Sequence, residues 1–226
     1  MKNEKKSTYP MRINKYLALK KISTRRGADE LVKEKKVFIN GKLAVLGSKV
    51  TEKDKVEVRG AEEKKYVYYA YNKPIGIETS SPKEGLFPLG RLDKASHGLM
   101  ILTNDGRITD QLLNPKYFHE KEYVVKTLNK LRSNFKQKME AGVNIEGYIT
   151  KPCKVQILND FAFRVTLTEG KKHQIRRMCS NLFQEVADLK REIIMNIKLG
   201  KLGSNSLREI KGEELAIFLN QVFHQF

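Results

Sequence analysis

Residues 90–103 have the sequence GRLDKASHGLMILT. Asp93 is an acid among basic residues, framed by Gly90 and Gly98, and the apolar run that begins at Leu99 predicts a buried strand. An acid near the end of a strand is more often a solvated turn residue or a cap than a catalytic group. The stretch by itself therefore predicts a loop followed by a strand, and it leaves both roles open for Asp93.

The chain on either side of this stretch alternates strands and helices without a regular βαβ repeat. Alternating or continuous apolar runs predict strands at 66–71, 99–102, 123–128, 155–158 and 161–167. Apolar residues at helical spacing predict helices at 107–113, 131–141, 173–182 and 213–223. The pattern indicates an α+β class, with a mixed, largely antiparallel sheet flanked by helices.

The N-terminal part has a different pattern. Apolar residues recur at helical spacing from Ile13 to Leu17 and from Ala28 to Val32, and a hydroxyl of the pair Ser23-Thr24 is placed to cap the second helix. The pair Asn40-Gly41, which accepts positive φ angles, predicts a hairpin between 37–39 and 42–45, and 56–58 predicts a further strand. We therefore expect a mobile tail at 1–10, a small αα-hairpin module at 11–59, a linker at 60–65 and a second domain at 66–226.

The charge of the chain is strongly positive and unevenly distributed. Lys and Arg outnumber Asp and Glu by 44 to 26, for a formal net charge of +18. Residues 1–60 alone hold 17 basic against 7 acidic residues, which is more than half of that excess. Such a field predicts a polyanionic partner, most simply a nucleic acid.

Other classes of protein fit less well. No apolar run approaches the roughly 18 residues of a spanning helix, and the N-terminus has no signal-peptide pattern, so we expect a cytoplasmic protein without a membrane partner. Cys153 and Cys179 lie far apart without metal-ligand spacing, and the four histidines are dispersed. We expect two reduced structural thiols and no metal site.

Three segments of the N-terminal module resemble the small RNA-binding domain first named for ribosomal protein S-four. They are MRINKYL at 11–17, STRR at 23–26 and VFINGK at 37–42, in matching order and spacing. The resemblance implies that Arg12, Lys15, Arg25 and Arg26 contact structured RNA. A merely solvated basic face is the alternative, and the module identifies no reaction.

A second basic segment, EGKKHQIRRMC at 169–179, follows a predicted strand and opens a helix. Ile175 and Met178 belong to its apolar face, so Arg176 and Arg177 point partly away from it. An arginine is an efficient partner for a carboxylate because its charge is permanent and its donors are forked. Simple phosphate binding is the alternative, and it is the preferred role for Arg177 or Lys172.

The catalytic region as a whole resembles the RsuA family of pseudouridine synthases, in the RluF and RluB branch that acts on large-subunit ribosomal RNA. The residues that carry this are NKPIG at 72–76, GRLD at 90–93 with its following strand, HEKEY at 119–123 and GKKHQIRRM at 170–178. The resemblance spans residues 11 to about 215 and implies a pseudouridine synthase fold. It implies that Asp93 is the essential carboxylate, Tyr123 stacks on the target uracil and Arg176 pairs with Asp93. It also implies RNA contacts by Arg91, His173 and Arg177, with Arg91 helping to extrude the nucleotide.

The implied reaction breaks the N1 glycosidic bond of uridine, rotates the base and rejoins it through C5. No atom is gained or lost, so no ATP, redox cofactor or metal is expected. Whether Asp93 attacks the ribose, attacks the base or removes a sugar proton stays open. We expect a monomer acting on ribosomal RNA, with transfer RNA as the alternative substrate.

Two departures from the family pattern affect the target rather than the chemistry. The segment 77–89 is shorter than the insert that relatives commonly carry, and His173 stands where close relatives often have another polar residue. The main rival function is a non-catalytic RNA-binding protein in ribosome assembly or translational control. DNA binding is supported by charge alone, and no acid pair or histidine pair suggests an RNA hydrolase.

Overall fold

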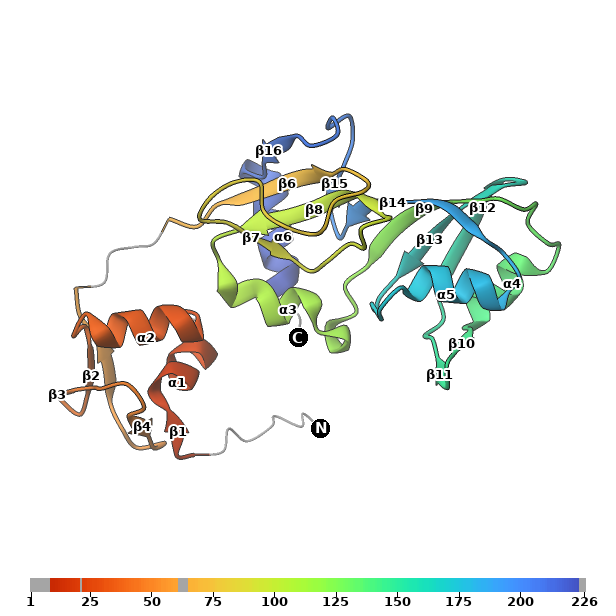
Figure 1. Ribbon diagram of the computed structural model, residues 1–226. Coiled ribbons are helices and arrows are strands. Elements are labelled where there is room, and N and C mark those ends of the chain that lie inside the picture. Colours follow the sequence, from red (N-terminus) through yellow and green to blue (C-terminus); the bar gives the residue numbers. More distant parts are fainter. Residues whose placement is uncertain (1–8, 21, 61–64, 224–226) are drawn as a thin grey trace. The chain divides into compact units, whose positions relative to one another are not determined.

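The computed structural model describes residues 9–20, 22–60 and 65–223 (Figure 1). The predicted tail at 1–10 and linker at 60–65 fall largely outside these ranges. The chain forms two compact units, and the sequence boundary between them lies at Lys65 and Tyr66. None of the helices in the described ranges is long and apolar enough to cross a membrane.

The first unit contains the two predicted helices and the predicted hairpin. Thr24 caps the second helix, since its Oγ1 accepts a hydrogen bond of 2.9 Å from the backbone N–H of Gly27. Asn40 and Gly41 have φ angles of 50° and 78°, as a type I′ turn requires. The elements are β1 (Met11–Arg12), α1 (Ile13–Leu19), α2 (Arg25–Lys33), β2 (Val37–Ile39), β3 (Lys42–Leu43), β4 (Lys49–Val50) and β5 (Val56–Val58). The sheet order β3-β2-β5 packs its apolar face on both helices.

The second unit is built on one large sheet of order β12-β13-β9-β14-β8-β6-β16, with β15 beside β14 and β7 beside β8. Its strands are β6 (Tyr68–Lys73), β7 (Phe87–Leu89), β8 (His97–Thr103), β9 (Lys121–Thr127), β12 (Lys154–Asn159), β13 (Ala162–Leu167), β14 (Val186–Ile194), β15 (Ile197–Lys198) and β16 (Leu207–Glu209). A separate hairpin consists of β10 (Asn144–Ile145) and β11 (Tyr148–Ile149). The pairing of β14 with β8 is parallel and the other pairings are antiparallel, so the predicted α+β class with a mixed, largely antiparallel sheet is confirmed.

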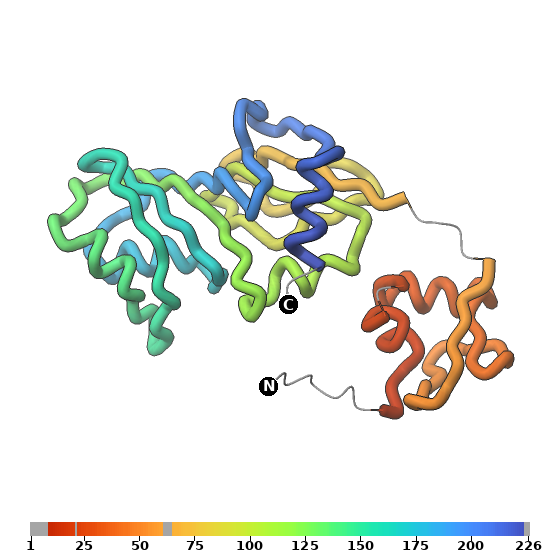
Figure 2. The backbone as a smooth tube through the Cα atoms, turned by 180° about the vertical axis from the view of Figure 1, so that it is seen from behind, coloured from red at the N-terminus to blue at the C-terminus, as the bar shows by residue number. Residues whose placement is uncertain are grey.

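The helices of this unit gather at the two ends of the sheet. They are α3 (Thr109–Leu113), α4 (Phe135–Ala141), α5 (Gln174–Asn181) and α6 (Gly212–Phe223). Seen from behind, α6 crosses β6 and β8 (Figure 2), and Phe218 and Val222 lie in one buried core with Leu99 and Ile101. The helices α4 and α5 form a second core with β9 and β13. The strand β14 joins the two cores, because Leu189 belongs to one and Ile194 to the other.

The parallel contact between β14 and β8 is short. It consists of two residue pairs, Lys190 with His97 and Arg191 with Gly98. Gly98 has a φ of +104°, and a Cβ on it would lie 2.3 Å from the carbonyl oxygen of Arg191. Only glycine fits such a close approach. The second glycine of the GRLDKASHG stretch is therefore required where the two halves of the sheet meet.

Most predicted elements are present with shifted ends, and one long strand was not predicted. The helix predicted at 131–141 begins only at Phe135, and the one predicted at 107–113 is divided into a 3-10 helix, Gly106–Ile108, and α3. The prediction missed β14, although it is the longest strand in the described ranges, because its centre carries Asp188, Lys190, Arg191 and Glu192. A buried strand with charged residues at its centre has no apolar pattern to detect.

Candidate active site

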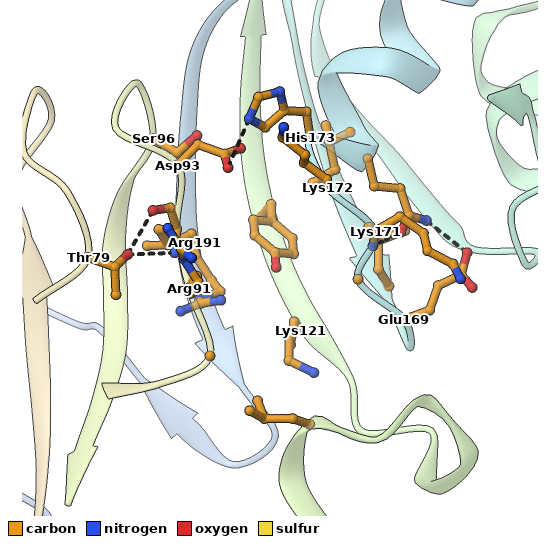
Figure 3. A pocket seen from close by; sticks show the side chains of 18 of the residues that line it. Thr79, Arg91, Asp93, Ser96, Lys121, Glu169, Lys171, Lys172, His173 and Arg191 are labelled. Carbon is orange, nitrogen blue, oxygen red and sulfur yellow. Dashed lines mark hydrogen bonds and ion pairs between the residues drawn. The ribbon is translucent and has the colours of Figure 1, made fainter. Parts of the chain in front are cut away.

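The pocket of this unit that contains Asp93 has a volume of about 800 Å³ (Figure 3). This lies in the range of about 300–1,000 Å³ that small-ligand sites occupy. Its walls are the loop at 90–96, the start of β9, the middle of β14 and the loop at 168–173. The pocket therefore lies where the two halves of the sheet meet.

The NKPIG segment, residues 72–76, holds the loop that carries Asp93 in place. Lys73 is fully buried, and its Nζ donates hydrogen bonds to the carbonyl oxygens of Pro74 at 2.9 Å and Ser96 at 2.8 Å. Burial lowers the pKa of Lys73, and the nearby charge of Asp93 opposes that shift. The backbone N–H of Gly76 adds a bond of 2.8 Å to the carbonyl oxygen of Lys94. Lys73 thus fixes the loop by hydrogen bonds to its backbone.

The short segment at 77–89 supports the same loop from the other side. Thr79 Oγ1 donates to the carbonyl oxygen of Leu92 at 2.8 Å and accepts from its backbone N–H at 3.0 Å (Figure 3). Glu78 and Thr79 also line the pocket. The segment whose length departs from the family pattern therefore forms part of the pocket wall.

Asp93 is partly exposed and faces His173. Its Oδ1 lies 3.3 Å from Nε2 of His173, and the two side chains point toward one another in Figure 3. The Asp93 side chain is 36% exposed, so the carboxylate is reachable from the pocket. His173 precedes α5 and has a left-handed φ of 51°, which turns the chain into the helix.

Arg176 does not pair with Asp93, so that prediction is wrong. Its Nη2 donates to the carbonyl oxygen of Ala95 at 2.8 Å and its Nη1 to that of Val186 at 3.2 Å. The guanidinium is therefore engaged by two backbone carbonyls, one in the Asp93 loop and one at the start of β14. It lies outside the residues that line the pocket and holds the loop rather than its carboxylate.

The loop before α5 is fixed by a buried acid. Glu169 is 3% exposed and accepts hydrogen bonds from Gln174 Nε2 at 2.9 Å, Tyr148 Oη at 2.5 Å and the backbone N–H of Lys151 at 3.0 Å. The hydrogen bond to Glu169 raises the pKa of Tyr148, with a smaller contribution from burial. This network positions the segment that ends in His173.

Arg177 lies on the other side of α5, away from the pocket. Its Nη2 lies 2.5 Å from Oε2 of Glu146 and 3.3 Å from the carbonyl oxygen of Ile145. An RNA contact by Arg177 therefore stays a prediction for the outer surface. Arg91 is exposed and lines the pocket, which is compatible with its expected role at the target nucleotide.

Tyr123 lines the pocket together with two cations that the sequence analysis did not single out. Lys121 and Tyr123 are two positions apart on β9, so their side chains point to the same face of the sheet. Arg191 on the neighbouring strand β14 stands opposite Tyr123. Arg191 is 3% exposed, and its Nε donates to the carbonyl oxygen of Leu99 at 2.7 Å. Burial and the charge of Arg191 lower the pKa of Lys121 to about 8. The sequence offered one signal for Lys121, because in the segment HEKEY it stands two positions before Tyr123 and so shares a strand face with it. It offered no such signal for Arg191.

The predicted RNA contacts of the first unit lie on its two helices and at their entry. Arg12, Arg25 and Arg26 are exposed, and Lys15 is half-buried. Their contact with RNA stays a prediction. In the described part of the chain, no group of three His, Cys, Asp or Glu side chains is placed to hold a metal ion.

Comparison with known proteins agrees with this geometry. The family model described as RNA pseudouridylate synthase matches residues 67–181, and the S4 domain matches residues 11–56. The dual-specificity RNA pseudouridine synthase RluF of Escherichia coli K12 is 39% identical over 224 residues, which cover 91% of this chain and 77% of that protein. The ribosomal large subunit pseudouridine synthase B of Bacillus subtilis 168 is 33% identical, over 90% of this chain and 93% of that protein. A crystal structure of a pseudouridylate synthase superposes with a TM-score of 0.68 at 26% identity, over 94% of this chain and 99% of that one.

The match of the second unit to RNA pseudouridylate synthases, with an S4 domain before it in the sequence, places the chain among RNA-modifying enzymes. The chain belongs to the RNA pseudouridylate synthase family. Its activity is accordingly that of an isomerase, the conversion of uridine in RNA to pseudouridine.

Proposed function

We propose that this enzyme modifies specific uridines of large-subunit ribosomal RNA, with Asp93 as its catalytic carboxylate. The relatives named above include one whose name specifies the large ribosomal subunit. The observation that carries the catalytic assignment is that Asp93 and Tyr123 line one pocket, although thirty residues separate them in the sequence. The loop at 90–96 and the strand β9 bring the acid and the aromatic ring to the same pocket.

The pocket suggests a distinct role for each side chain. Asp93 would act on the ribose or the base, and Tyr123 would hold the unstacked uracil, a contact worth about 1–3 kcal/mol. His173, at 3.3 Å, is in position to orient the carboxylate. Arg176 would act as a positioning residue through Ala95, and Arg91, at the rim, would help to displace the nucleotide from its stack.

We also propose the domain division 11–59 for RNA binding and 66–226 for catalysis, with 60–65 as the linker. We also propose that the enzyme acts as a monomer. Sedimentation of the purified protein tests this. Ribosomal RNA as substrate favours the cytoplasm as the site of action.

Arg25 and Arg26 offer a direct test of the RNA-binding domain. Replacing both with Gln is expected to weaken binding of large-subunit ribosomal RNA and to lower the slope of log affinity against log salt by about 1.4, or about 0.7 for each lost phosphate contact. The control is the double variant Lys42→Gln and Lys53→Gln, which removes two exposed charges from the same unit. Equal slopes in the two double variants would refute contact through the start of α2.

The proposed target is tested by mapping pseudouridine in ribosomal and transfer RNA from cells with and without this gene. We expect one or a few sites in large-subunit RNA to lose modification and to regain it when the purified enzyme is added. Loss of sites only in transfer RNA would overturn the ribosomal assignment. Full modification at all sites in the deletion strain would favour the rival function, an RNA-binding protein without catalysis.

A further inference from the structure

Two cations in the pocket, the half-buried Lys121 and the buried Arg191, have no role in the mechanism above. Lys121 on β9 and Arg191 on β14 both line the cavity and are labelled in Figure 3. Lys121 is separated from Tyr123 by one residue, and Arg191 stands opposite Tyr123 in the register of the two strands. All three side chains therefore emerge on the same face of the sheet.

Two neighbouring cations in one pocket destabilise the folded protein, so folding does not explain their presence. The pKa of Lys121 is lowered to about 8 by burial and by the like charge of Arg191. Arg191 is 3% exposed, and its Nη2 has no hydrogen-bond acceptor among the described residues. Buried charges are ordinarily paired with an opposite charge, since an unpaired one destabilises the fold. Two like charges side by side in a pocket point to an anionic or carbonyl oxygen that enters with the substrate.

We infer that Lys121 and Arg191 bind a carbonyl oxygen of the target uracil and stabilise the negative charge that the base acquires in the reaction. When the N1–C1′ bond breaks, its electron pair stays on the base, and the negative charge is shared between N1 and the carbonyl oxygens. The new C5–C1′ bond then forms, C5 loses its proton and N1 gains one, so atoms and charge balance. Fixed cations at an oxygen that gains charge lower the barrier to that step.

The position of the two cations favours the base over a phosphate group. The guanidinium carbon of Arg191 lies 6.0 Å from the centroid of the Tyr123 ring, so a base stacked on that ring brings its carbonyl oxygens toward Arg191. Phosphate is more strongly hydrated, and exposed cations at Arg91, Lys94, Lys171 and Lys172 line the same pocket. Lys121 and Arg191 are therefore assigned to the base and the exposed residues to the backbone of the RNA.

The inference rests on the proposed function and is tested with unmodified large-subunit ribosomal RNA transcribed in vitro. Lys121→Met keeps the apolar stem and removes the charge. We expect its single-turnover rate at pH 7 to fall about 100-fold, the scale of losing one donor of an oxyanion hole, with unchanged affinity for the RNA. The control is Lys126→Met on the opposite face of β9, which is exposed and should keep the full rate. Weaker RNA binding with a normal rate at saturation would make Lys121 a phosphate contact and overturn the inference.

Thermal unfolding separates this role from a structural one. Lys121 is half-buried, and its Nζ donates one long hydrogen bond, of 3.4 Å, to the carbonyl oxygen of His119, without a carboxylate partner among the described residues. Removing this charge should raise the melting temperature of Lys121→Met while the rate falls. The rise should be largest below pH 8, where Lys121 is charged in the folded protein, and should shrink at higher pH. A variant that melts lower and reacts more slowly would indicate mere support of the fold and refute the inference.

The pH dependence of the rate gives a third measurement. The wild-type rate should fall as pH rises through about 8, because Lys121 then loses its proton, and Lys121→Arg should not show this fall. The other ionisable groups that line the pocket are Glu78, Arg91, Asp93, Lys94, His119, Tyr123, Glu169, Lys171, Lys172, His173 and Arg191. A fall at the same pH in Lys121→Arg would assign it to one of them and contradict the inference.

The outcomes also separate the inference from the function on which it rests. If the wild-type enzyme forms no pseudouridine in the transcript, the proposed ribosomal function fails, and the inference fails with it. If the wild type converts the transcript and Lys121→Met does so at the same rate, the inference alone fails.

Discussion

Asp93→Asn is expected to abolish pseudouridine formation while RNA affinity is retained. The substitution keeps the shape of the side chain and removes its charge, and loss of a catalytic acid lowers rates by about 10⁴-fold or more in comparable cases. Affinity should persist because the basic residues are untouched. The measurement pairs single-turnover conversion with an equilibrium binding assay on the same RNA.

The matched control for Asp93→Asn is Asp160→Asn. Asp160 is an exposed acid whose carboxylate lies 2.8 Å from Nζ of Lys130, so the same chemical change there should leave the rate unaltered. Conversion by Asp93→Asn within tenfold of the wild-type rate would show that the carboxylate is not essential. Loss of both binding and conversion would indicate a folding defect instead, which circular dichroism would detect.

Gly98→Ala is expected to have the largest effect on stability. The new Cβ would lie 2.3 Å from the carbonyl oxygen of Arg191, and φ is +104° at this position. Overpacking and backbone strain together should lower the free energy of unfolding by about 2–5 kcal/mol. Urea unfolding of the purified proteins measures this difference.

Gly147→Ala is the control for Gly98→Ala. Gly147 has a φ of +83° with no atom within 4 Å of the position of a Cβ, so only backbone strain is added there, at about 1–2 kcal/mol. If the two variants lose equal stability, strain alone matters and the close approach of β8 to β14 is not critical. Gly98→Ala should also lose activity, because the displaced carbonyl belongs to Arg191.

The fold could be predicted where apolar residues recur at the spacing of a strand or a helix. The strand at β13 and the helix α6 have clear alternating or helical patterns, and Asn40-Gly41 specifies its own turn. The strand β14 was not predictable because its buried residues include Arg191, whose burial depends on contacts with β8 and β9. The local sequence of a strand does not show which neighbouring strands will supply hydrogen bonds to a buried charged side chain.

The site was predictable in part for the same reason. Asp93 and Tyr123 were identified from motifs, and both line the pocket. The predicted partner of Asp93, Arg176, was wrong. The left-handed turn at His173 determines how α5 meets the Asp93 loop. That turn places His173 at the carboxylate and Arg176 at the carbonyl oxygen of Ala95. Non-glycine residues rarely adopt this conformation, so the sequence gives little warning of it.

Because β14 joins the two cores, it determines when during folding the enzyme becomes active. Asp93 precedes β8 in one half of the sheet, Tyr123 lies in the other, and β14 is shared between their cores. A chain in which only one half has folded holds either the acid or the aromatic ring, but not both at one cavity. During synthesis, β14 emerges after both of these residues. Nascent or locally unfolded chains would therefore be inert toward uridine, and catalytic competence would appear in one cooperative step.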